Sequence, residues 1–174
     1  MSYFKSRRSA VVARNGSVAT SQPLAAQAGL QMLRDGGNAI DAAVATAAVL
    51  NVVEPMSTGI GGDMFALIWD KNERKVVSLN GSGRQAAAAN VDDVRKAGYE
   101  SIPNNGAGSH FAVSVPGTVH GWETALNQYG RMTLKEVLQP AIDYALNGYA
   151  VSEVIAHGWG GADTITKLNH RPSG

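Results

Sequence analysis

The sequence predicts a layered α/β domain in which helices pack against a β-hairpin. Two observations carry this prediction: two consecutive helical segments at 21–55 precede a strand–turn–strand segment at 64–79, and further helical segments follow from residue 118. Hydrophobic residues make up 44% of the 174 residues and charged residues 17%, which is typical of a folded globular chain. A chain of this length corresponds to one domain or to a piece of a larger one.

Charge and cysteine content exclude several classes of function. The net charge is only +1, and the one basic doublet, Arg7-Arg8, is far short of the basic patch that nucleic-acid binding needs. The absence of cysteine excludes disulfides and thiolate metal sites. Residues 1–10 are basic but lack the apolar core of a signal peptide, so the expected location is the cytoplasm.

The first elements are predicted from turn and cap residues. An Asn-Gly dipeptide between two short apolar runs predicts a small strand–turn–strand over residues 10–20. A helix is then predicted after Ser21 or Gln22 as its N-cap, with Pro23 in the first turn, where a missing N–H costs nothing. The Gly-Gly pair at 36–37 ends this helix in a left-handed turn.

A second helix is predicted over residues 39–53, capped by Asn38 with Asp41 at the capping-box position. The segment is almost wholly apolar and rich in alanine, so it must be covered on all sides by closely packed neighbours. A membrane span is the alternative, but polar residues interrupt the run, and it falls short of the roughly 18 apolar residues that a span requires. A buried core helix, with no membrane contact, is therefore favoured.

A β-hairpin is predicted next, with strands at 64–70 and 75–79. Both faces are mostly apolar, so we expect the hairpin to be central in a sheet and covered on both sides. The loop before it, Ser-Thr-Gly-Ile-Gly-Gly-Asp at 57–63, could suggest a phosphate cradle. Here, however, a helix precedes the glycines and a strand follows them, which is the reverse of the nucleotide-binding order. Tight turning of the backbone is the better interpretation.

Caps and periodicity predict the remaining elements. They are a short helix at 91–97 capped by Asn90, a loop at 102–109, a strand at 110–115, a helix at 118–128, a helix that follows Thr133 with Glu136 at its capping-box position and continues to residue 147, and a last helical turn after Ser152.

Arg84 is the candidate binding residue. It follows the second strand across Gly-Ser-Gly at 81–83, so it leaves the sheet end on an adjustable backbone. A guanidinium in this position can hold a carboxylate by two parallel hydrogen bonds. The alternative is an arginine that is merely solvated at a strand end.

No catalytic or metal-binding constellation is predicted within this chain. The serines lack the spacing of a hydrolase triad, and no Gly-x-Ser-x-Gly motif is present. The histidines have no metal-ligand spacing, and His120 is expected to be a packing residue on a helix face. The four histidines are His110, His120, His157 and His170.

Five segments, in their order and spacing, resemble the γ-glutamyltransferase family. They are residues 19–37, 38–55, 57–68, 115–122 and 129–148, and the resemblance covers nearly all of the chain from about residue 10 to residue 152. It implies an αββα N-terminal-nucleophile hydrolase fold that is incomplete here, with residues 1–174 forming the first part of the large subunit of a single domain.

The resemblance also implies a chemistry. Family members cut their own precursor just before a threonine, which then attacks the γ-glutamyl amide of glutathione-like substrates and passes the acyl group to water or to an amino acid. That threonine lies outside this chain, so no catalytic residue is expected here. The implied partner is the remainder of the precursor, as the small subunit of a heterodimer or higher oligomer. No metal or organic cofactor is implied.

The resemblance assigns Arg84 to the α-carboxylate of the γ-glutamyl group, with one departure. The family's arginine stands three residues ahead of an Ala-Pro pair. If Gln85-Ala86 or Ala86-Ala87 replaces that pair here, strict spacing places Ser82 or Gly83 at the position of the arginine. This departure favours a second hypothesis, a cephalosporin (glutaryl) acylase-like amidase of the same superfamily. A third hypothesis, from another class, is an inactive truncated fragment.

Overall fold

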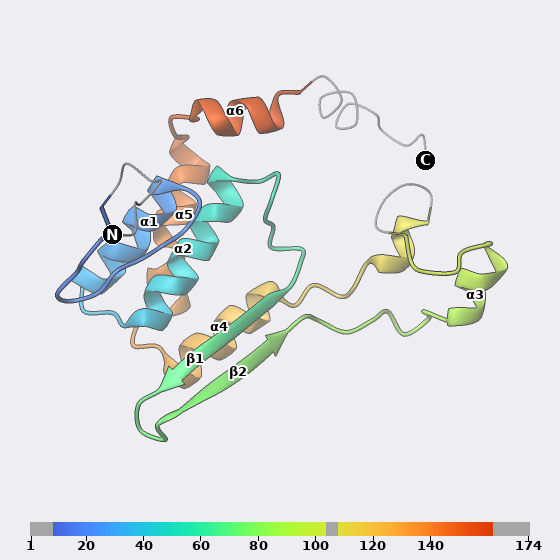
Figure 1. Ribbon diagram of the computed structural model, residues 1–174, viewed down its shortest axis with the longest axis horizontal. Coiled ribbons are helices and arrows are strands. Elements are labelled where there is room, and N and C mark those ends of the chain that lie inside the picture. Colours follow the sequence, from blue (N-terminus) through green and yellow to red (C-terminus); the bar gives the residue numbers. More distant parts are fainter. Residues whose placement is uncertain (1–8, 104–107, 162–174) are drawn as a thin grey trace, which may run out of the picture.

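The computed structural model describes residues 9–103 and 108–161. In chain order, the described elements are α1 (Pro23–Arg34), α2 (Ala39–Val53), β1 (Met64–Asp70), β2 (Lys75–Gly81), α3 (Val91–Lys96), the 3₁₀ helix η1 (Ser109–Ala112), α4 (Thr118–Tyr129), α5 (Leu134–Asn147) and α6 (Glu153–Trp159). Helices α1, α2 and α5 lie side by side, and α4 contacts both strands (Figure 1). The predicted mixed α/β arrangement is confirmed in this part of the chain.

Helix α2 is the centre of the core. It packs against α1 on one side and α5 on the other, and Ala45 and Val49 are fully buried. Small residues let the helices approach closely: a Cβ added to Gly29 of α1 would lie 2.3 Å from the Thr46 hydroxyl of α2. Burial on all sides was predicted, but Ala39 and the residue one turn later, Ala43, are exposed. Among the described helices, none is long and apolar enough to cross a membrane.

Side-chain caps set the starts of the helices as the sequence predicts. The Gln22 side chain caps α1 by accepting the N–H of the second helical residue. Asn38 and Asp41 form a complete capping box at α2, and Thr133 and Glu136 form another at α5. These caps satisfy backbone N–H groups that have no partner within the helix.

The carboxylate of Asp41 also joins α2 to a distant turn. Besides the N–H of Asn38, at 2.6 Å, Asp41 accepts the N–H groups of Arg131 and Met132, at 3.0 and 3.1 Å. These two residues lie in the turn between α4 and α5. Asp41 is fully buried, and its hydrogen bonds with several backbone donors compensate for the loss of water.

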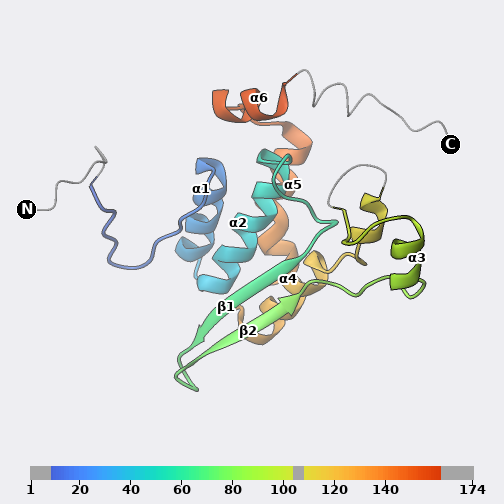
Figure 2. The ribbon, with the colours of Figure 1, turned by 45° about the vertical axis from the view of Figure 1, so that its right-hand side comes forward.

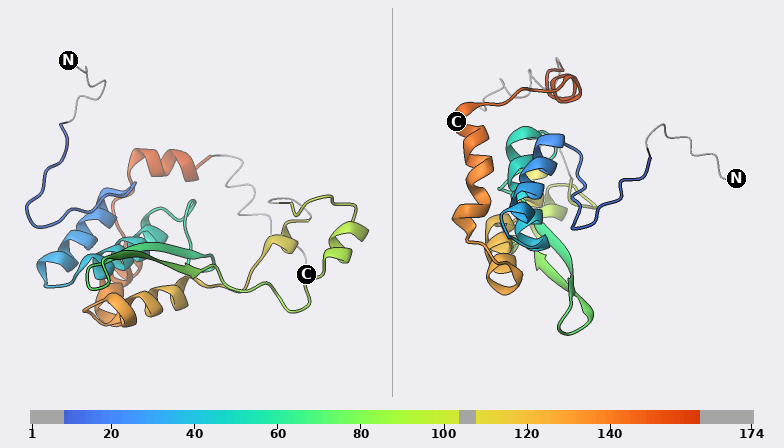
Figure 3. Two further views of the ribbon diagram at one scale, coloured as in Figure 1. Left: turned by 60° about the horizontal axis from the view of Figure 1, so that its bottom comes forward. Right: turned by 90° about the vertical axis from the view of Figure 1, so that its left-hand side faces the viewer.

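The hairpin is covered on one face only. Its register pairs Met64 with Gly81 and Ile68 with Val77. Met64, Ala66 and Ile68 face inward and are buried or half-buried, and α4 packs against the hairpin (Figure 3). On the opposite face, Phe65, Leu67 and Trp69 are 65%, 80% and 62% exposed. Coverage on both faces, which the apolar composition predicted, is therefore not found within the described residues.

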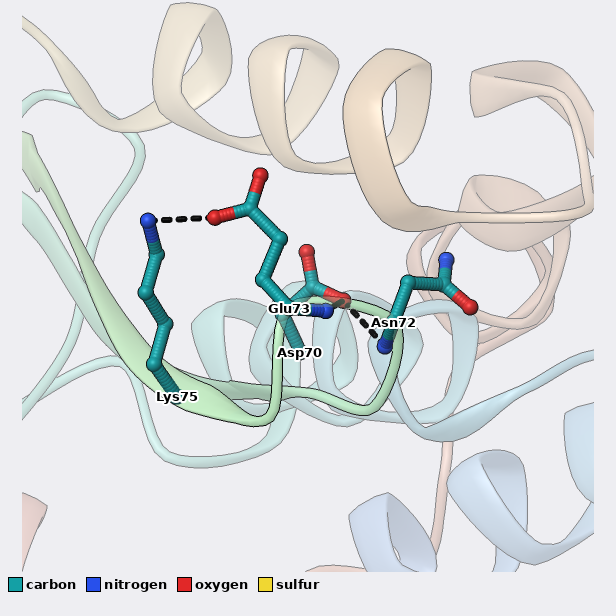
Figure 4. A network of polar contacts seen from close by, with 4 residues as sticks. All are labelled: Asp70, Asn72, Glu73 and Lys75. Atoms are coloured by element: carbon teal, nitrogen blue, oxygen red, sulfur yellow. Dashed lines mark hydrogen bonds and ion pairs between the residues drawn. The ribbon is translucent and has the colours of Figure 1, made fainter.

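The hairpin turn is held by local polar contacts (Figure 4). The Asp70 carboxylate accepts the N–H of Asn72 at 2.8 Å and that of Glu73 at 3.3 Å, and Glu73 forms an ion pair with Lys75. Arg74 has a φ of 52°, in the left-handed region where side chains other than glycine are strained. This turn lies at the opposite end of the hairpin from Arg84.

The predictions of β structure in two segments are wrong. Residues 10–20 have no strand conformation, and residues 110–115 begin in η1 and continue to a single bridge between Ser114 and Gln85. Local 3₁₀-type bonds are made instead, such as that from the Val113 N–H to the His110 carbonyl, at 3.3 Å. Of the loop predicted at 102–109, residues 104–107 lie outside the described part. Helix α3 and η1 lie beyond the end of β2, away from the helical layer (Figure 2).

Candidate functional site

Three loops meet at the end of the hairpin where β1 begins and β2 ends. The antiparallel register pairs Met64 with Gly81, so the loop before β1 lies beside the loop after β2. The third loop, just before α4, joins them through the Gly62 carbonyl, which accepts the N–H groups of Gly117 at 3.0 Å and Thr118 at 3.1 Å. We call this meeting point of residues 62–63, 81–85 and 114–118 the loop junction.

Glycines make the loop junction compact. Gly83 has a φ of +73°, and a Cβ added there would lie 1.8 Å from the Val115 carbonyl oxygen. A Cβ on Gly117 would lie 2.3 Å from the Gly81 carbonyl oxygen. No side chain fits either position without a shift of the backbone. The backbone around Arg84, expected to be adjustable, is therefore closely packed.

Arg84 follows β2 as the sequence predicts, but β2 runs to Gly81, two residues further than predicted, so Arg84 lies three residues beyond its end. Its carbonyl accepts the Val115 N–H at 2.7 Å, which anchors the backbone, while its side chain is exposed. The described ion pairs involve other residues, so within residues 9–103 and 108–161 the Arg84 guanidinium has no carboxylate partner. An always-charged fork of donors on a fixed backbone is available for an external carboxylate.

A cleft of about 390 Å³ lies beside the loop junction, between the end of α2, the glycine-rich loop and the start of α4. Asp63 and Thr118 are in its wall. One Asp63 carboxylate oxygen lies 3.4 Å from the Ser114 hydroxyl, which lies at the same distance from the Ser82 carbonyl oxygen. The Thr118 hydroxyl is buried and has no hydrogen-bond partner in the described part of the chain.

The loop junction brings together residues that the sequence did not single out. Asp63 and Ser114 are far apart in the chain, and the strand register and the Gly62 contacts bring both into the loop junction. The one local signal was the Gly-Gly-Asp run directly before a strand, which placed a carboxylate at the end of a sheet. Ser82 and Gly83, the two positions that strict family spacing selects, lie in the same junction.

The structure describes His110, His120 and His157. His120, expected to be a packing residue, is exposed on α4, so that prediction is wrong. His110 stacks near the Phe111 ring with centroids 4.0 Å apart. His170 lies outside the described residues. Across the described ranges, no three histidine or carboxylate side chains form a group that could hold a metal ion.

A larger cleft, of about 1060 Å³, lies elsewhere, between α1 and α5. Its carboxylates are already engaged: Asp35 accepts from Gln31 at 2.8 Å, and Asp143 from Gln139 at 2.8 Å. Glu136 in the same cleft belongs to the α5 capping box. By volume alone, this cleft would be the candidate site. The loop junction is the better candidate because three loops meet there and the Arg84 guanidinium has no carboxylate partner among the described residues.

Comparison with known proteins gives one family. The gamma-glutamyltranspeptidase family model matches residues 25–173. Over 143 residues, 82% of this chain, the sequence is 47% identical to the glutathione hydrolase-like YwrD proenzyme of Bacillus subtilis. The match covers 26% of that relative, so the chain spans about a quarter of its length.

Solved structures give the same result. Cephalosporin acylase from Bacillus halodurans superposes with a TM-score of 0.85 and 47% identity, over 98% of this chain and 31% of that one. Helicobacter pylori gamma-glutamyltranspeptidase superposes with a TM-score of 0.79 and 35% identity, over 92% of this chain and 46% of that one. The chain belongs to the gamma-glutamyltranspeptidase family.

Proposed function

We propose that the complete protein is a γ-glutamyl hydrolase or transferase that acts on glutathione-like γ-glutamyl amides. The observation that carries this proposal is the 47% identity to a glutathione hydrolase-like proenzyme over 82% of the chain. The attacking group is a threonine freed by cleavage of the precursor, outside residues 1–174. Its α-amine takes the hydroxyl proton as the hydroxyl oxygen attacks the amide carbonyl, and gives that proton to the amine that leaves when the amide bond breaks. Water or an amino acid then attacks the resulting ester and takes the γ-glutamyl group, which restores the threonine hydroxyl.

In this proposal, residues 1–174 form the first part of the large subunit and supply one wall of the substrate site. Arg84 binds the α-carboxylate of the γ-glutamyl group. Two features support this role: the side chain is exposed at the loop junction, and its carbonyl is anchored by the Val115 N–H at 2.7 Å. An anchored backbone reduces the entropy lost when the guanidinium orders on a substrate.

The remainder of the precursor is the proposed partner, and the outer face of the hairpin is where it packs. Phe65, Leu67 and Trp69 leave an apolar surface uncovered, and a two-stranded hairpin is marginal without further strands or packing. A second sheet stacked on this face would complete the αββα architecture, with large and small subunits together as a heterodimer.

Intact-mass measurement on the complete gene product tests the processing. We expect two polypeptides, the second beginning with threonine, and release of p-nitroaniline from γ-glutamyl-p-nitroanilide. A single uncleaved polypeptide without this activity would overturn the proposal.

The role of Arg84 has its own test. We expect Arg84→Ala in the complete enzyme to raise KM for γ-glutamyl-p-nitroanilide roughly 10- to 100-fold, because a charge-assisted hydrogen bond contributes about 1.5–3 kcal/mol. Self-cleavage should be spared. Arg95→Ala, which removes an exposed arginine of α3, is the matched control. Unchanged kinetics in the Arg84 variant would remove this residue from the site.

A second candidate is a glutaryl-type cephalosporin acylase. The similarity to the Bacillus halodurans cephalosporin acylase, with a TM-score of 0.85, favours it. So does the Gln-Ala-Ala-Ala-Ala sequence after Arg84, which contains no Ala-Pro pair. Hydrolysis of glutaryl-p-nitroanilide in preference to γ-glutamyl-p-nitroanilide would select this candidate.

A further inference from the structure

An asparagine is followed directly by a glycine at four places in the chain, and the structure describes three of these pairs. They are Asn15-Gly16, Asn80-Gly81 and Asn147-Gly148, whereas the pair at 105–106 lies outside the described residues. In such a pair, the glycine backbone nitrogen can attack the asparagine side chain, because no Cβ on the second residue hinders the approach. The attack needs a backbone N–H without a hydrogen bond and a backbone that can turn.

The pair Asn15-Gly16 meets both requirements. It lies at a bend in the loop before α1, and both residues are exposed. Neither the Asn15 side chain nor the Gly16 N–H has a hydrogen-bond partner within residues 9–103 and 108–161. No described helix or strand includes residues 10–20, so a local turn of the backbone breaks no hydrogen bonds of a helix or sheet.

The pair Asn80-Gly81 is held in β2. The strand register places these residues opposite Phe65 and Met64, and the Asn80 side-chain oxygen accepts the Ser82 N–H at 3.0 Å. Gly81 is closely packed as well, because an added Cβ would lie 2.9 Å from the Met64 carbonyl oxygen. Attack by the Gly81 nitrogen therefore requires the end of β2 to separate from β1.

The pair Asn147-Gly148 lies at the end of α5, and its protection is weaker. Asn147 is exposed, but the Gly148 N–H donates to the Tyr144 carbonyl at 3.0 Å. This nitrogen becomes available only when the last turn of the helix opens. Helix ends open more readily than paired strands in a core, so we expect this pair to be intermediate between the other two.

We propose that Asn15 is a site of spontaneous deamidation in the folded protein. The Gly16 nitrogen forms a bond to the side-chain carbonyl carbon of Asn15 and loses its proton to the solvent. The side-chain nitrogen takes up a proton and leaves as ammonia, so a succinimide ring remains. Water then opens this ring at either of its carbonyl carbons, which gives aspartate or isoaspartate at position 15.

The modification changes both the charge and the backbone of the loop before α1. Asn15 lies in the wall of a cleft of about 650 Å³, in which Arg131 is the one charged residue among the described residues that line it. A carboxylate at position 15 brings the opposite charge into the same cleft, which is favourable. Isoaspartate carries this charge too, but it also inserts the side-chain carbon into the backbone.

The test uses the complete protein, incubated at mildly alkaline pH with and without guanidinium chloride. Peptide mapping by mass spectrometry follows each Asn-Gly pair separately through the mass change from amide to acid. In the folded protein, we expect Asn15 to convert roughly 10-fold faster than Asn80, with Asn147 between them, because only Asn15 needs no local opening. In the unfolded protein, the three rates should become similar. Asn15→Gln, whose longer side chain disfavours ring closure, should abolish the change at this position.

Two outcomes would overturn the inference. If Asn15 stayed an amide in the folded protein while the unfolded chain was converted, the loop before α1 would be protected. If Asn15 and Asn80 reacted at equal rates in the folded protein, strand pairing would have no part in the selection. Neither outcome concerns the cleavage of γ-glutamyl amides, so the proposed function would stand in both cases.

Discussion

Asp41 shows how one residue can serve two levels of structure. As the third residue of α2 it accepts the N–H of Asn38, and this local role is visible in the sequence. The same carboxylate accepts the N–H groups of Arg131 and Met132, about which the sequence is silent because they lie 90 and 91 positions away. The negative charge also lies at the positive end of the α2 dipole, which is favourable, and none of the described ion pairs gives it a cationic partner.

Removal of the Asp41 carboxylate should therefore destabilise the fold. We expect Asp41→Asn to lower the free energy of unfolding by roughly 1–3 kcal/mol. The reason is that the side-chain NH₂ group of asparagine cannot accept hydrogen bonds from the buried backbone N–H groups. The measurement is urea denaturation followed by far-UV circular dichroism on the complete protein. Asp35→Asn, at an exposed helix end, is the control and should shift the midpoint little. Equal midpoints for the two variants would contradict the account.

Gly83 gives a second prediction at the residue scale. A Cβ at Gly83 meets the Val115 carbonyl oxygen at 1.8 Å, so Gly83→Ala must displace the loop junction as well as strain a backbone with a φ of +73°. We expect a loss of roughly 2–4 kcal/mol in stability together with a raised KM for γ-glutamyl-p-nitroanilide.

Gly36→Ala is the matched control for Gly83→Ala. Gly36 has a φ of +94°, but nothing lies within 4 Å of an added Cβ. This variant carries the backbone strain alone, so it should lose only about 1–2 kcal/mol and leave KM unchanged. Identical behaviour of the two variants would show that close packing at the loop junction has no part in the site.

At the scale of elements, the start of α5 depends on a charged cap. The pKa of Glu136 is lowered from its ordinary value of 4.5, first by the hydrogen bond from the Thr133 hydroxyl and then by that from the Thr133 N–H. These bonds measure 2.6 and 2.8 Å. Because the folded-state pKa is the lower one, the capping contribution is complete above pH 4.5 and is lost as the pH falls through the folded-state pKa.

The sign of this shift predicts a pH-dependent effect of Glu136→Gln. The variant should melt at a lower temperature than the wild type at pH 7, and the gap should close at pH values below the folded-state pKa of Glu136, where the wild-type cap is protonated as well. Thermal denaturation across a pH series measures the gap. Glu100→Gln, in an exposed loop, should show no such trend. A gap that persists at low pH would rule out the charged cap.

Most helices could be predicted because their signals are local. Caps at Gln22, Asn38, Thr133 and Ser152 all act within three residues of the helix start. The two segments wrongly predicted to form strands, at 10–20 and 110–115, show the limit of this approach, since a strand exists only where another strand pairs with it. Their apolar residues satisfied the pattern, but no partner strand lies beside them in the described residues.

The candidate site could likewise be predicted only in part. The position of Arg84 after a strand could be predicted, because it depends only on where β2 ends. The nearness of Asp63 and Ser114 could not, because it follows from the pairing of Met64 with Gly81 and from the Gly62 carbonyl contacts. The resemblance to a family predicted the role of Arg84. The strand register and the loop contacts, which only the structure shows, identified the residues that lie in the same junction.

At the scale of the whole molecule, the outer face of the hairpin is an apolar surface that no described residues cover. Helix α4 contacts both strands, whereas the outer face exposes Phe65, Leu67 and Trp69 beside Val76. Burial of a large apolar side chain contributes about 1.5–3 kcal/mol, so a face of this composition is expected to have a covering partner. The chain spans 26% of the length of its Bacillus subtilis relative, and the proposed function assigns this cover to the remainder of the precursor.

This assignment predicts opposite effects of one pair of changes in two contexts. In residues 1–174 expressed alone, Leu67→Thr with Trp69→Thr should reduce aggregation and the binding of a hydrophobic dye, because the exposed apolar face becomes polar without loss of strand propensity. In the complete protein, the same pair should lower the free energy of unfolding by several kcal/mol, since both side chains are then buried against the second sheet. Sedimentation velocity and dye fluorescence report the first effect, and chemical denaturation reports the second.

Val91→Thr in α3 is the control for a general gain in surface polarity. If the paired change left the complete protein as stable as the wild type, the outer face of the hairpin would not be the surface that meets the rest of the precursor.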